Sequence, residues 1–221
     1  MKNKKEIVNK LKKELNHNGY FTNFFKKYGL SDLYIGKGTL GPEMSWVAYN
    51  LTKYIFRNKT SFKDKKVLDM GVGSGMQTVA SVLAGAKKVY SLDISPEAIK
   101  SIKLNKKKFK MSNVRIMKSN LFHKLTNELF DIIIFNHPFL EGTPKNSSDF
   151  VYLTAKKTLN NFFINAKKFL SKNGIIIMPF SYLGDHDPSF YARKYNYSIN
   201  KKILFKNKYG KHAIFFIKNK K

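Results

Sequence analysis

Residues 67–75 read VLDMGVGSG, a short apolar run that leads directly into a loop with glycine at every second position. A short apolar run bounded by turn residues is typical of a buried strand. Glycine lets the backbone adopt turns that other residues resist, and it lets the backbone come close to a ligand. Residues 76–84 then favour a helix, so this stretch predicts a strand, a tight loop and a helix in series. In doubly wound sheets, ligands bind at the carboxyl ends of such strands.

Apolar runs alternate with helical segments from residue 65 to the end of the chain. This alternation predicts an α/β fold with a seven-stranded, mostly parallel sheet and helices on both faces. The last two runs have no helix between them, so we expect an antiparallel hairpin at the sheet edge. The expected strands are residues 67–70, 88–92, 114–117, 130–135, 175–178, 197–205 and 211–218, and the expected helices are residues 43–57, 76–84, 96–108 and 150–170, the last ended by Asn173 and Gly174.

The first 40 residues differ in character from the rest and predict a helical extension or lid, with residues 41–221 as the main domain. Val8, Leu11 and Leu15 recur at helical spacing with lysines between them. Five aromatic residues then lie between positions 20 and 28, beside two lysines. We interpret this aromatic segment as packing against the core; the alternative is a substrate platform with bases stacked on exposed rings.

The net charge of the chain is +28, from 42 Lys and Arg against 14 Asp and Glu. A charge of this size is typical of proteins that bind polyanions. Only Arg57, Arg115 and Arg193 are arginines, however, and phosphate readers favour the bidentate arginine fork. The lysines are spread along the whole chain, as AT-rich coding would produce. Charge alone therefore leaves nucleic-acid binding open.

The sequence contains no cysteine, which excludes disulfides, cysteine–zinc sites and thiol nucleophiles. No apolar run is long enough to cross a membrane, so no membrane partner is expected. The N-terminus carries charge without a following apolar segment, which predicts a cytoplasmic protein. His123, His186 and His212 lack metal-ligand spacing and are expected in loops, and residues 185–187 are interpreted as a turn before Pro188. No metal is expected.

Asp93 follows Gly75 by 18 residues and ends the next predicted strand. A carboxylate at that position can accept hydrogen bonds from both hydroxyls of a ribose. The glycine loop, the following helix and this acid together predict a site for a nucleoside-containing cofactor. The dinucleotide fingerprint requires G-x-G-x-x-G, whereas residues 71–75 give G-x-G-x-G, which disfavours a dinucleotide.

Both motifs resemble those of the Rossmann-like S-adenosylmethionine (SAM) methyltransferases: the glycine loop resembles their first motif, and residues 92–98 their second. Ser119–Phe122 falls where such enzymes carry an adenine-contacting residue, here Asn120. The resemblance implies SAM as cofactor and S-adenosyl-L-homocysteine as product. The cofactor-binding residues that it implies are Asp69, Gly71, Gly73, Gly75, Asp93, Ile94, Asn120 and Asn136.

Asn136-His137-Pro138-Phe139 follows the predicted strand 130–135 and resembles the N-P-P-Y/F motif of methyltransferases that act on amide or nucleobase nitrogen. The resemblance assigns these four residues to catalysis. The Asn136 side-chain oxygen and the His137 carbonyl would accept the two N–H groups of a planar nitrogen and aim its lone pair at the methyl group. Phe139 would pack on the planar group. His137 departs from the motif, which has proline there.

Over residues 40–220 the chain resembles the HemK-like glutamine methyltransferases of release factors, which implies in-line methyl transfer to a protein side-chain amide. The bacterial form of that family has a larger helical substrate domain than the 40 residues that precede the match here. A nucleobase amine of RNA or DNA and a small-molecule amine are the alternative acceptors. A non-catalytic RNA-binding module with the same fold is a further alternative, and the sequence does not indicate an oligomeric state.

Overall fold

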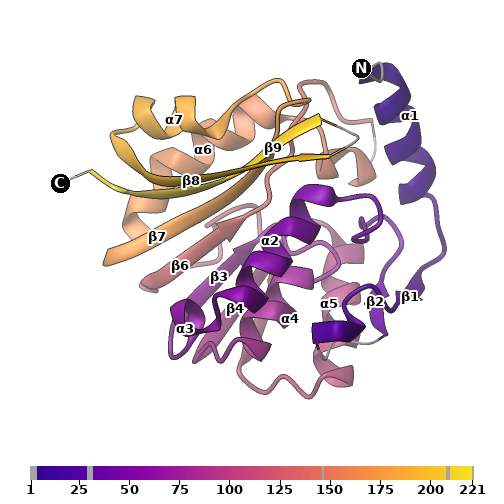
Figure 1. Ribbon diagram of the computed structural model, residues 1–221, viewed down its shortest axis with the longest axis horizontal. Helices are drawn as coiled ribbons and strands as arrows, with labels where there is room; N and C mark the ends of the chain where they lie inside the picture. The colour runs from indigo at the N-terminus through magenta and orange to yellow at the C-terminus, as the bar shows by residue number, and fades with distance from the viewer. Residues whose placement is uncertain (1–3, 29–31, 146, 208–209, 221) are drawn as a thin grey trace.

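The computed structural model describes residues 4–28, 32–145, 147–207 and 210–220, with a seven-stranded sheet at its centre (Figure 1). The strand order is β5-β4-β3-β6-β7-β9-β8, and only the β7–β9 and β9–β8 pairs are antiparallel. The predicted α/β, Rossmann-like fold with an antiparallel edge hairpin is therefore confirmed. The strands are β3 (Lys66–Met70), β4 (Lys88–Asp93), β5 (Val114–Lys118), β6 (Phe130–Phe135), β7 (Leu170–Ser181), β8 (Tyr197–Asn207) and β9 (Gly210–Asn219).

Alternation of side chains along the central strands produces two hydrophobic cores, one on each face of the sheet. Val67 and Ile132 belong to one core, and their neighbours Leu68 and Ile133 belong to the other. All four side chains are buried, which explains why the sequences of these strands are continuous apolar runs. The sheet is thus the middle layer of three.

Helices cover both faces of the sheet (Figure 1). The first core is closed by α2 (Trp46–Arg57), α4 (Met76–Leu83) and α5 (Pro96–Lys108). The second core is closed by α6 (Ala155–Ala166) and α7 (Pro188–Lys194). Short turns of helix, α3 (Lys59–Phe62), η2 (Ser147–Val151) and η3 (Lys167–Phe169), lie in the connections.

The N-terminal segment begins with α1 (Lys4–Leu15), followed by the small sheet of β1 (Tyr20–Thr22) and β2 (Leu33–Ile35) with η1 (Lys26–Tyr28) between its strands. Leu11 and Leu15 of α1 pack with Leu140 and Tyr152, beyond the end of β6. The helix therefore lies over the segment that carries the predicted acceptor motif.

The aromatic segment packs on the core as predicted. Phe25 is buried in the first core, and the Tyr28 ring stacks on Phe56 of α2 with centroids 4.8 Å apart. Phe21 and Phe24 remain exposed at 61% and 38%. The β1–β2 hairpin was not predicted, because its strands are only three residues long.

The predicted helix over residues 150–170 is wrong in its bounds. Thr154 has a left-handed backbone (φ +72°) that separates η2 from α6, and β7 begins at Leu170. Gly174 lies inside β7 and does not end a helix. A Cβ at Gly174 would lie 2.9 Å from the Phe130 carbonyl oxygen, so glycine here permits close approach of two strands.

Three smaller expectations also change. The predicted helix at 43–57 begins at Trp46. The turn expected at residues 185–187 is an irregular segment, and Asp187 caps α7, a helix that was not predicted; the Asp187 carboxylate accepts a hydrogen bond from the Ser189 N–H. His212 lies in β9, paired with Ser181 of β7, and not in a loop.

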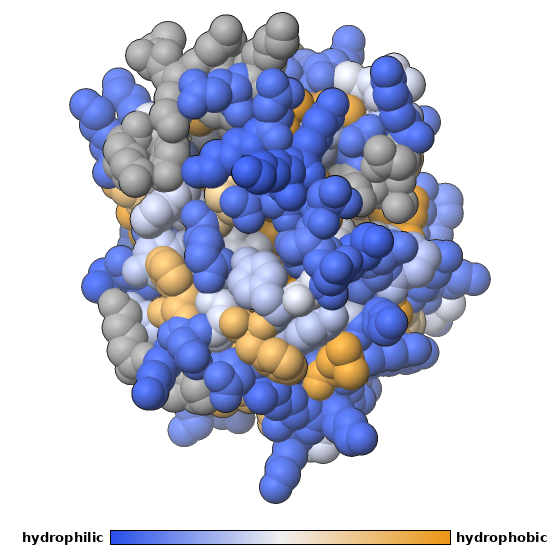
Figure 2. Space-filling view, turned by 90° about the vertical axis from the view of Figure 1, so that its right-hand side faces the viewer, coloured by the Kyte–Doolittle hydropathy of each residue, from blue (hydrophilic) through white to orange (hydrophobic). Residues whose placement is uncertain are grey.

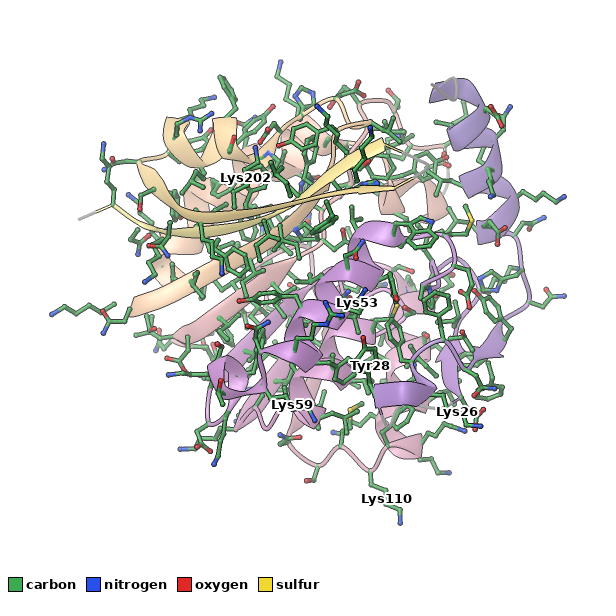
Figure 3. The ribbon with its side chains drawn as sticks, in the orientation of Figure 1. Lys26, Tyr28, Lys53, Lys59, Lys110 and Lys202 are labelled. Carbon is green, nitrogen blue, oxygen red and sulfur yellow. The ribbon has the colours of Figure 1, made fainter. Side chains whose placement is uncertain are left out.

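One face of the molecule is strongly hydrophilic. Figure 2 shows the face on the side of α1 and α5, where hydrophobic residues appear only as small separate patches. Exposed lysines such as Lys26, Lys59, Lys110 and Lys202 belong to different elements, and Lys110 points away from the body of the molecule (Figure 3). No helix among the described residues is both long and apolar enough to span a bilayer.

Candidate active site

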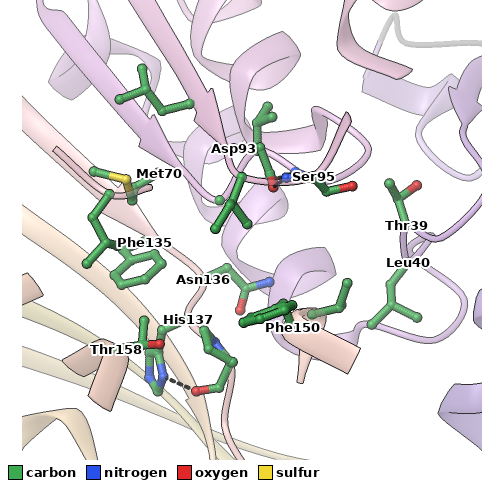
Figure 4. Close-up of a pocket in the computed structure, with 18 of the residues that line it drawn as sticks. Thr39, Leu40, Met70, Asp93, Ser95, Phe135, Asn136, His137, Phe150 and Thr158 are labelled. Carbon is green, nitrogen blue, oxygen red and sulfur yellow. Dashed lines mark hydrogen bonds between the residues drawn. The ribbon is translucent and has the colours of Figure 1, made fainter. Parts of the chain in front are cut away.

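A cavity of about 400 Å³ opens at the carboxyl ends of β3, β4 and β6. In the sheet, β3 lies between β4, which follows it in the chain, and β6, which does not. The cavity lies at this point, which is the usual ligand position in such sheets. The cavity also reaches the segment after β5. The predicted site residues that line it are Gly71, Gly73, Asp93, Ile94, Asn120, Asn136, His137, Pro138 and Phe139 (Figure 4).

The Asp93 carboxylate, at the end of β4, holds the glycine loop in place. One oxygen accepts a hydrogen bond from the Gly73 N–H and the other from the Ser95 N–H, each at 2.9 Å. Burial raises the pKa of Asp93, and these backbone hydrogen bonds oppose that shift. Each carboxylate oxygen can accept more than one hydrogen bond, so Asp93 can still accept hydroxyl groups from a ligand in the cavity.

Gly73 and Gly75 occupy left-handed conformations (φ +52° and +87°) that favour glycine. A Cβ at Gly73 would meet no atom within 4 Å, so it would project into open space at the cavity. Gly75 does not line the cavity; a Cβ there would collide with the Ile102 side chain of α5. Glycine at position 75 therefore allows α5 to pack closely against the loop.

Asp69 likewise lies behind the cavity and does not line it. Its side chain is buried, and one carboxylate oxygen accepts a hydrogen bond from the Thr78 hydroxyl of α4 at 2.6 Å. Burial raises the pKa of Asp69 to about 7, and the nearby Asp93 charge adds to this effect. Asp69 therefore joins β3 to α4 and is not among the residues that line the cavity.

The acceptor motif begins immediately after β6. Figure 4 shows the Asn136 amide projecting into the space between Asp93 and the Phe150 ring, while the His137 ring turns to the opposite side. His137 Nδ1 lies 2.7 Å from the Pro138 carbonyl oxygen. Because a carbonyl can only accept, Nδ1 carries the proton in this contact. The side chain is 3% exposed, and burial lowers the pKa of His137 to about 4, so the ring is neutral near pH 7.

A model of the "Methyltransferase small domain" family matches residues 52–181, more than half of the chain. The chain belongs to the methyltransferase small domain family. The matched region runs from α2 to the end of β7 and so includes the glycine loop, Asp93 and the Asn136 motif.

Known proteins similar to this methyltransferase small domain include a relative from Methanocaldococcus jannaschii that is provisionally named protein N5-glutamine methyltransferase. The two chains are 33% identical over 132 residues, which is 55% of this chain and 64% of the relative. The match thus spans less than two thirds of the relative's length.

Solved structures share the fold. A ribosomal protein L11 methylase from Lactobacillus delbrueckii superposes with a TM-score of 0.61 at 21% identity, covering 82% of this chain and 81% of that one. A provisionally named methyltransferase complexed with SAH superposes with a TM-score of 0.60 at 16% identity, covering 86% and 51%. At these identities the likeness shows the fold alone.

Several cavity residues of the methyltransferase small domain were not predicted from the sequence. Phe150 comes from η2, and Lys157, Thr158 and Asn161 come from α6. Thr39 and Leu40 come from the loop between β2 and α2. These residues are far from the recognised motifs in sequence, and only the packing of α6 and the N-terminal loop around the sheet end brings them together. Among the described residues, no group of three or more His, Asp or Glu side chains could hold a metal ion.

Proposed function

We propose that this methyltransferase domain moves a methyl group from SAM to a planar nitrogen, and that the acceptor is a protein side-chain amide of the glutamine type. One observation carries the proposal: Asp93 and Asn136 line the same cavity, at the ends of strands β4 and β6. The proposed cofactor site and the proposed acceptor site would therefore share one space.

The cavity fits the proposed cofactor. Its volume of about 400 Å³ is in the usual range of ~300–1,000 Å³ for small-molecule sites. Asp93 would accept the ribose hydroxyls, Asn120 would bind the adenine amine, and the open space at Gly73 would admit the ligand close to the backbone. Met70, Leu92 and other apolar side chains supply the rest of the wall. SAM, when bound, supplies a methyl group on a positively charged sulfur.

The acceptor residues would act by orientation and electrostatics. The Asn136 oxygen and the His137 backbone carbonyl would accept the two N–H groups of a primary amide, which favours a pyramidal nitrogen as positive charge develops. The Pro138 carbonyl is already occupied by the His137 ring. Every residue has a backbone carbonyl, so His137 would replace the usual proline without removing the acceptor that the motif needs.

The name of the relative from Methanocaldococcus jannaschii supports an amide acceptor, because it describes a glutamine methyltransferase. A nucleobase amine is the second candidate, and the observation that favours it is the net charge of +28. The two candidates need the same hydrogen-bond acceptors, because both present an –NH₂ group attached to a planar system.

The test is to incubate the protein with tritium-labelled SAM in a cell extract and to treat separate portions with protease and with nuclease. We expect the label to become soluble with protease, and acid hydrolysis of the labelled protein to release methylamine from a methylated amide. Label released by nuclease alone would replace the amide with a nucleobase as acceptor. If neither protein nor nucleic acid carries the label, both proposed acceptors are contradicted.

A further inference from the structure

A second, smaller cavity of about 100 Å³ adjoins the active-site cavity. The two share Leu40, Ser45, Val47 and Phe139 in their walls, so Phe139 of the acceptor motif stands between them. Asp93 lines only the first cavity. A molecule held at Asn136 and Phe139 would have this space beside it.

Besides the shared residues, the second cavity is lined by residues that do not line the first. Leu11 comes from α1, Met44 and Trp46 come from the start of α2 and the loop before it, and Leu183 follows β7. Leu11 is buried against Leu140 in the third hydrophobic cluster. The N-terminal helix therefore forms one wall of a space next to the acceptor motif.

The chemistry of the cavity is that of an apolar pocket with a charged rim. Its wall is formed mainly by aliphatic, Met and aromatic side chains, together with the buried Ser45, Ser181 and His212, whereas the exposed Glu6, Lys10 and Glu43 lie at its edge. Glu43 is held in place, because its carboxylate accepts hydrogen bonds from Thr22 at 2.6 Å and Tyr20 at 3.0 Å. A pocket of this kind binds an apolar group and leaves neighbouring polar atoms in water.

We infer that the second cavity is a subsite for the aliphatic side chain of a residue that flanks the methylated amide in a protein acceptor. This inference rests on the proposed function. Its volume of about 100 Å³ is below the ~150 Å³ of a cavity that admits benzene, so it suits a Leu, Ile or Met side chain better than an aromatic ring.

The experiment uses blocked heptapeptides with a central glutamine, alanine elsewhere, and Gly, Leu, Met, Phe or Lys at each flanking position in turn. Methyl transfer from labelled SAM is measured for each peptide. We expect kcat/KM for Leu or Met at one flank to exceed that for Gly or Lys by at least about tenfold, since single methylene groups in apolar pockets discriminate roughly 10–200-fold. An RNA oligonucleotide serves as the alternative acceptor.

Two variants test whether this cavity is responsible for the preference among peptides. Ser181 lines the second cavity and not the first, so Ser181→Leu should fill it, remove the preference for Leu and Met, and leave SAM affinity unchanged. Leu183→Ala should enlarge it and shift the preference toward Phe. Ser112→Leu, at an exposed position before β5, is the matched control and should change nothing. A gain of Phe-peptide activity cannot result from mere loss of folding.

A binding measurement completes the test. With ¹³C-methyl-labelled methionine and SAH present, the Met44 signal should shift on addition of the Leu peptide and not of the Gly peptide. Equal methylation of all peptides, or no change of preference in Leu183→Ala, would overturn the subsite and leave the proposed function standing. If no peptide accepts the methyl group, the proposed function fails and the subsite with it; methylation of the RNA would then identify a nucleobase acceptor.

Discussion

Asp93 has two tasks at the residue scale, because its carboxylate fixes the Gly73 backbone and also faces the cavity. We expect Asp93→Ala to weaken SAM binding by roughly tenfold to a few hundredfold, since a hydrogen bond to a charged group is worth about 1.5–3 kcal/mol. Isothermal titration measures the affinity, and circular dichroism checks folding. Unchanged affinity in a folded variant would remove Asp93 from the cofactor site.

Asn136 is expected to act on the acceptor. Asn136→Ala should lower kcat by roughly a hundredfold or more, the scale of losing one hydrogen-bond partner of a transition state, while SAM affinity stays nearly intact. Asn120→Ala is the matched control, because Asn120 lines the cavity after β5 and should affect SAM affinity in place of kcat. A parallel loss of SAM affinity and rate in Asn136→Ala would make Asn136 a cofactor or folding residue.

His137 should make stability depend on pH. Its pKa is about 4 in the folded chain and near 6.5 in the unfolded chain, so between these values only the unfolded chain binds the proton. His137 should therefore contribute most to the free energy of unfolding above pH 6.5. This contribution should fall by up to about 3 kcal/mol as the pH decreases to 4, since a difference of one pKa unit corresponds to roughly 1.4 kcal/mol.

The measurement is urea unfolding of the natural protein and of His137→Phe at pH 4.5 and pH 7. Asp69 makes stability depend on pH in the opposite direction, because its raised pKa means that the folded chain keeps this proton to a higher pH than the unfolded chain. Both proteins contain Asp69, so the difference between them isolates the effect of His137. The natural protein should lose more stability on acidification than the variant does. Parallel curves would show that the pKa of His137 is the same in the folded and the unfolded chain.

At the scale of elements, α1 is the part whose removal should separate cofactor binding from catalysis. Leu11 and Leu15 pack beside the acceptor motif, whereas the cofactor cavity is formed by β3, β4 and β6. We expect deletion of residues 1–16 to abolish methyl transfer and to leave SAM binding within a few-fold. Normal turnover of the truncated protein would show that α1 is only an extension.

A longer deletion through residue 30 would be a poorer test. It would also remove Phe25, which is 1% exposed in the first core, and truncating a buried aromatic side chain typically costs ~3–5 kcal/mol of stability. Loss of activity in that variant would not distinguish unfolding from loss of a lid. The structure thus divides the N-terminal extension into a helix near the acceptor site and a hairpin that belongs to the core.

For the whole molecule, the charge of +28 predicts different salt effects for the two acceptor classes. With an amide acceptor, methyl transfer should change only weakly between about 50 and about 200 mM salt, because exposed charges are screened over a Debye length of ~10 Å at 0.1 M. With a nucleic-acid acceptor, log K should fall with log salt by about 0.7–0.9 per phosphate contacted. Steady-state assays at fixed SAM concentration measure the slope. A steep slope with RNA would reverse the order of the two candidates.

The strands and their order of appearance could be predicted because each buried strand is a local apolar run, as in 130–135, and the ends of β3, β4, β5 and β6 carry motifs. Elements that depend on contacts between distant segments were missed or misplaced. The end of α6 is one example. In the sequence Gly174 resembles a residue that ends a helix, but in the structure glycine is needed there because the Phe130 backbone lies so close. The three-residue strands of the small sheet are too short to produce a periodic signal.

The amino-acid sequence alone determined the α/β fold, the glycine loop, Asp93 and the Asn136 motif, because these depend on residue types at fixed short spacings. Only the tertiary structure decided which of the predicted residues face the cavity: it turned Asp69 and Gly75 inward, toward Thr78 and Ile102. It also brought α1, the 40–47 segment and the end of β7 together around a second cavity. Such a cavity has no signature in the sequence, because its walls come from residues whose proximity is set by packing of whole elements.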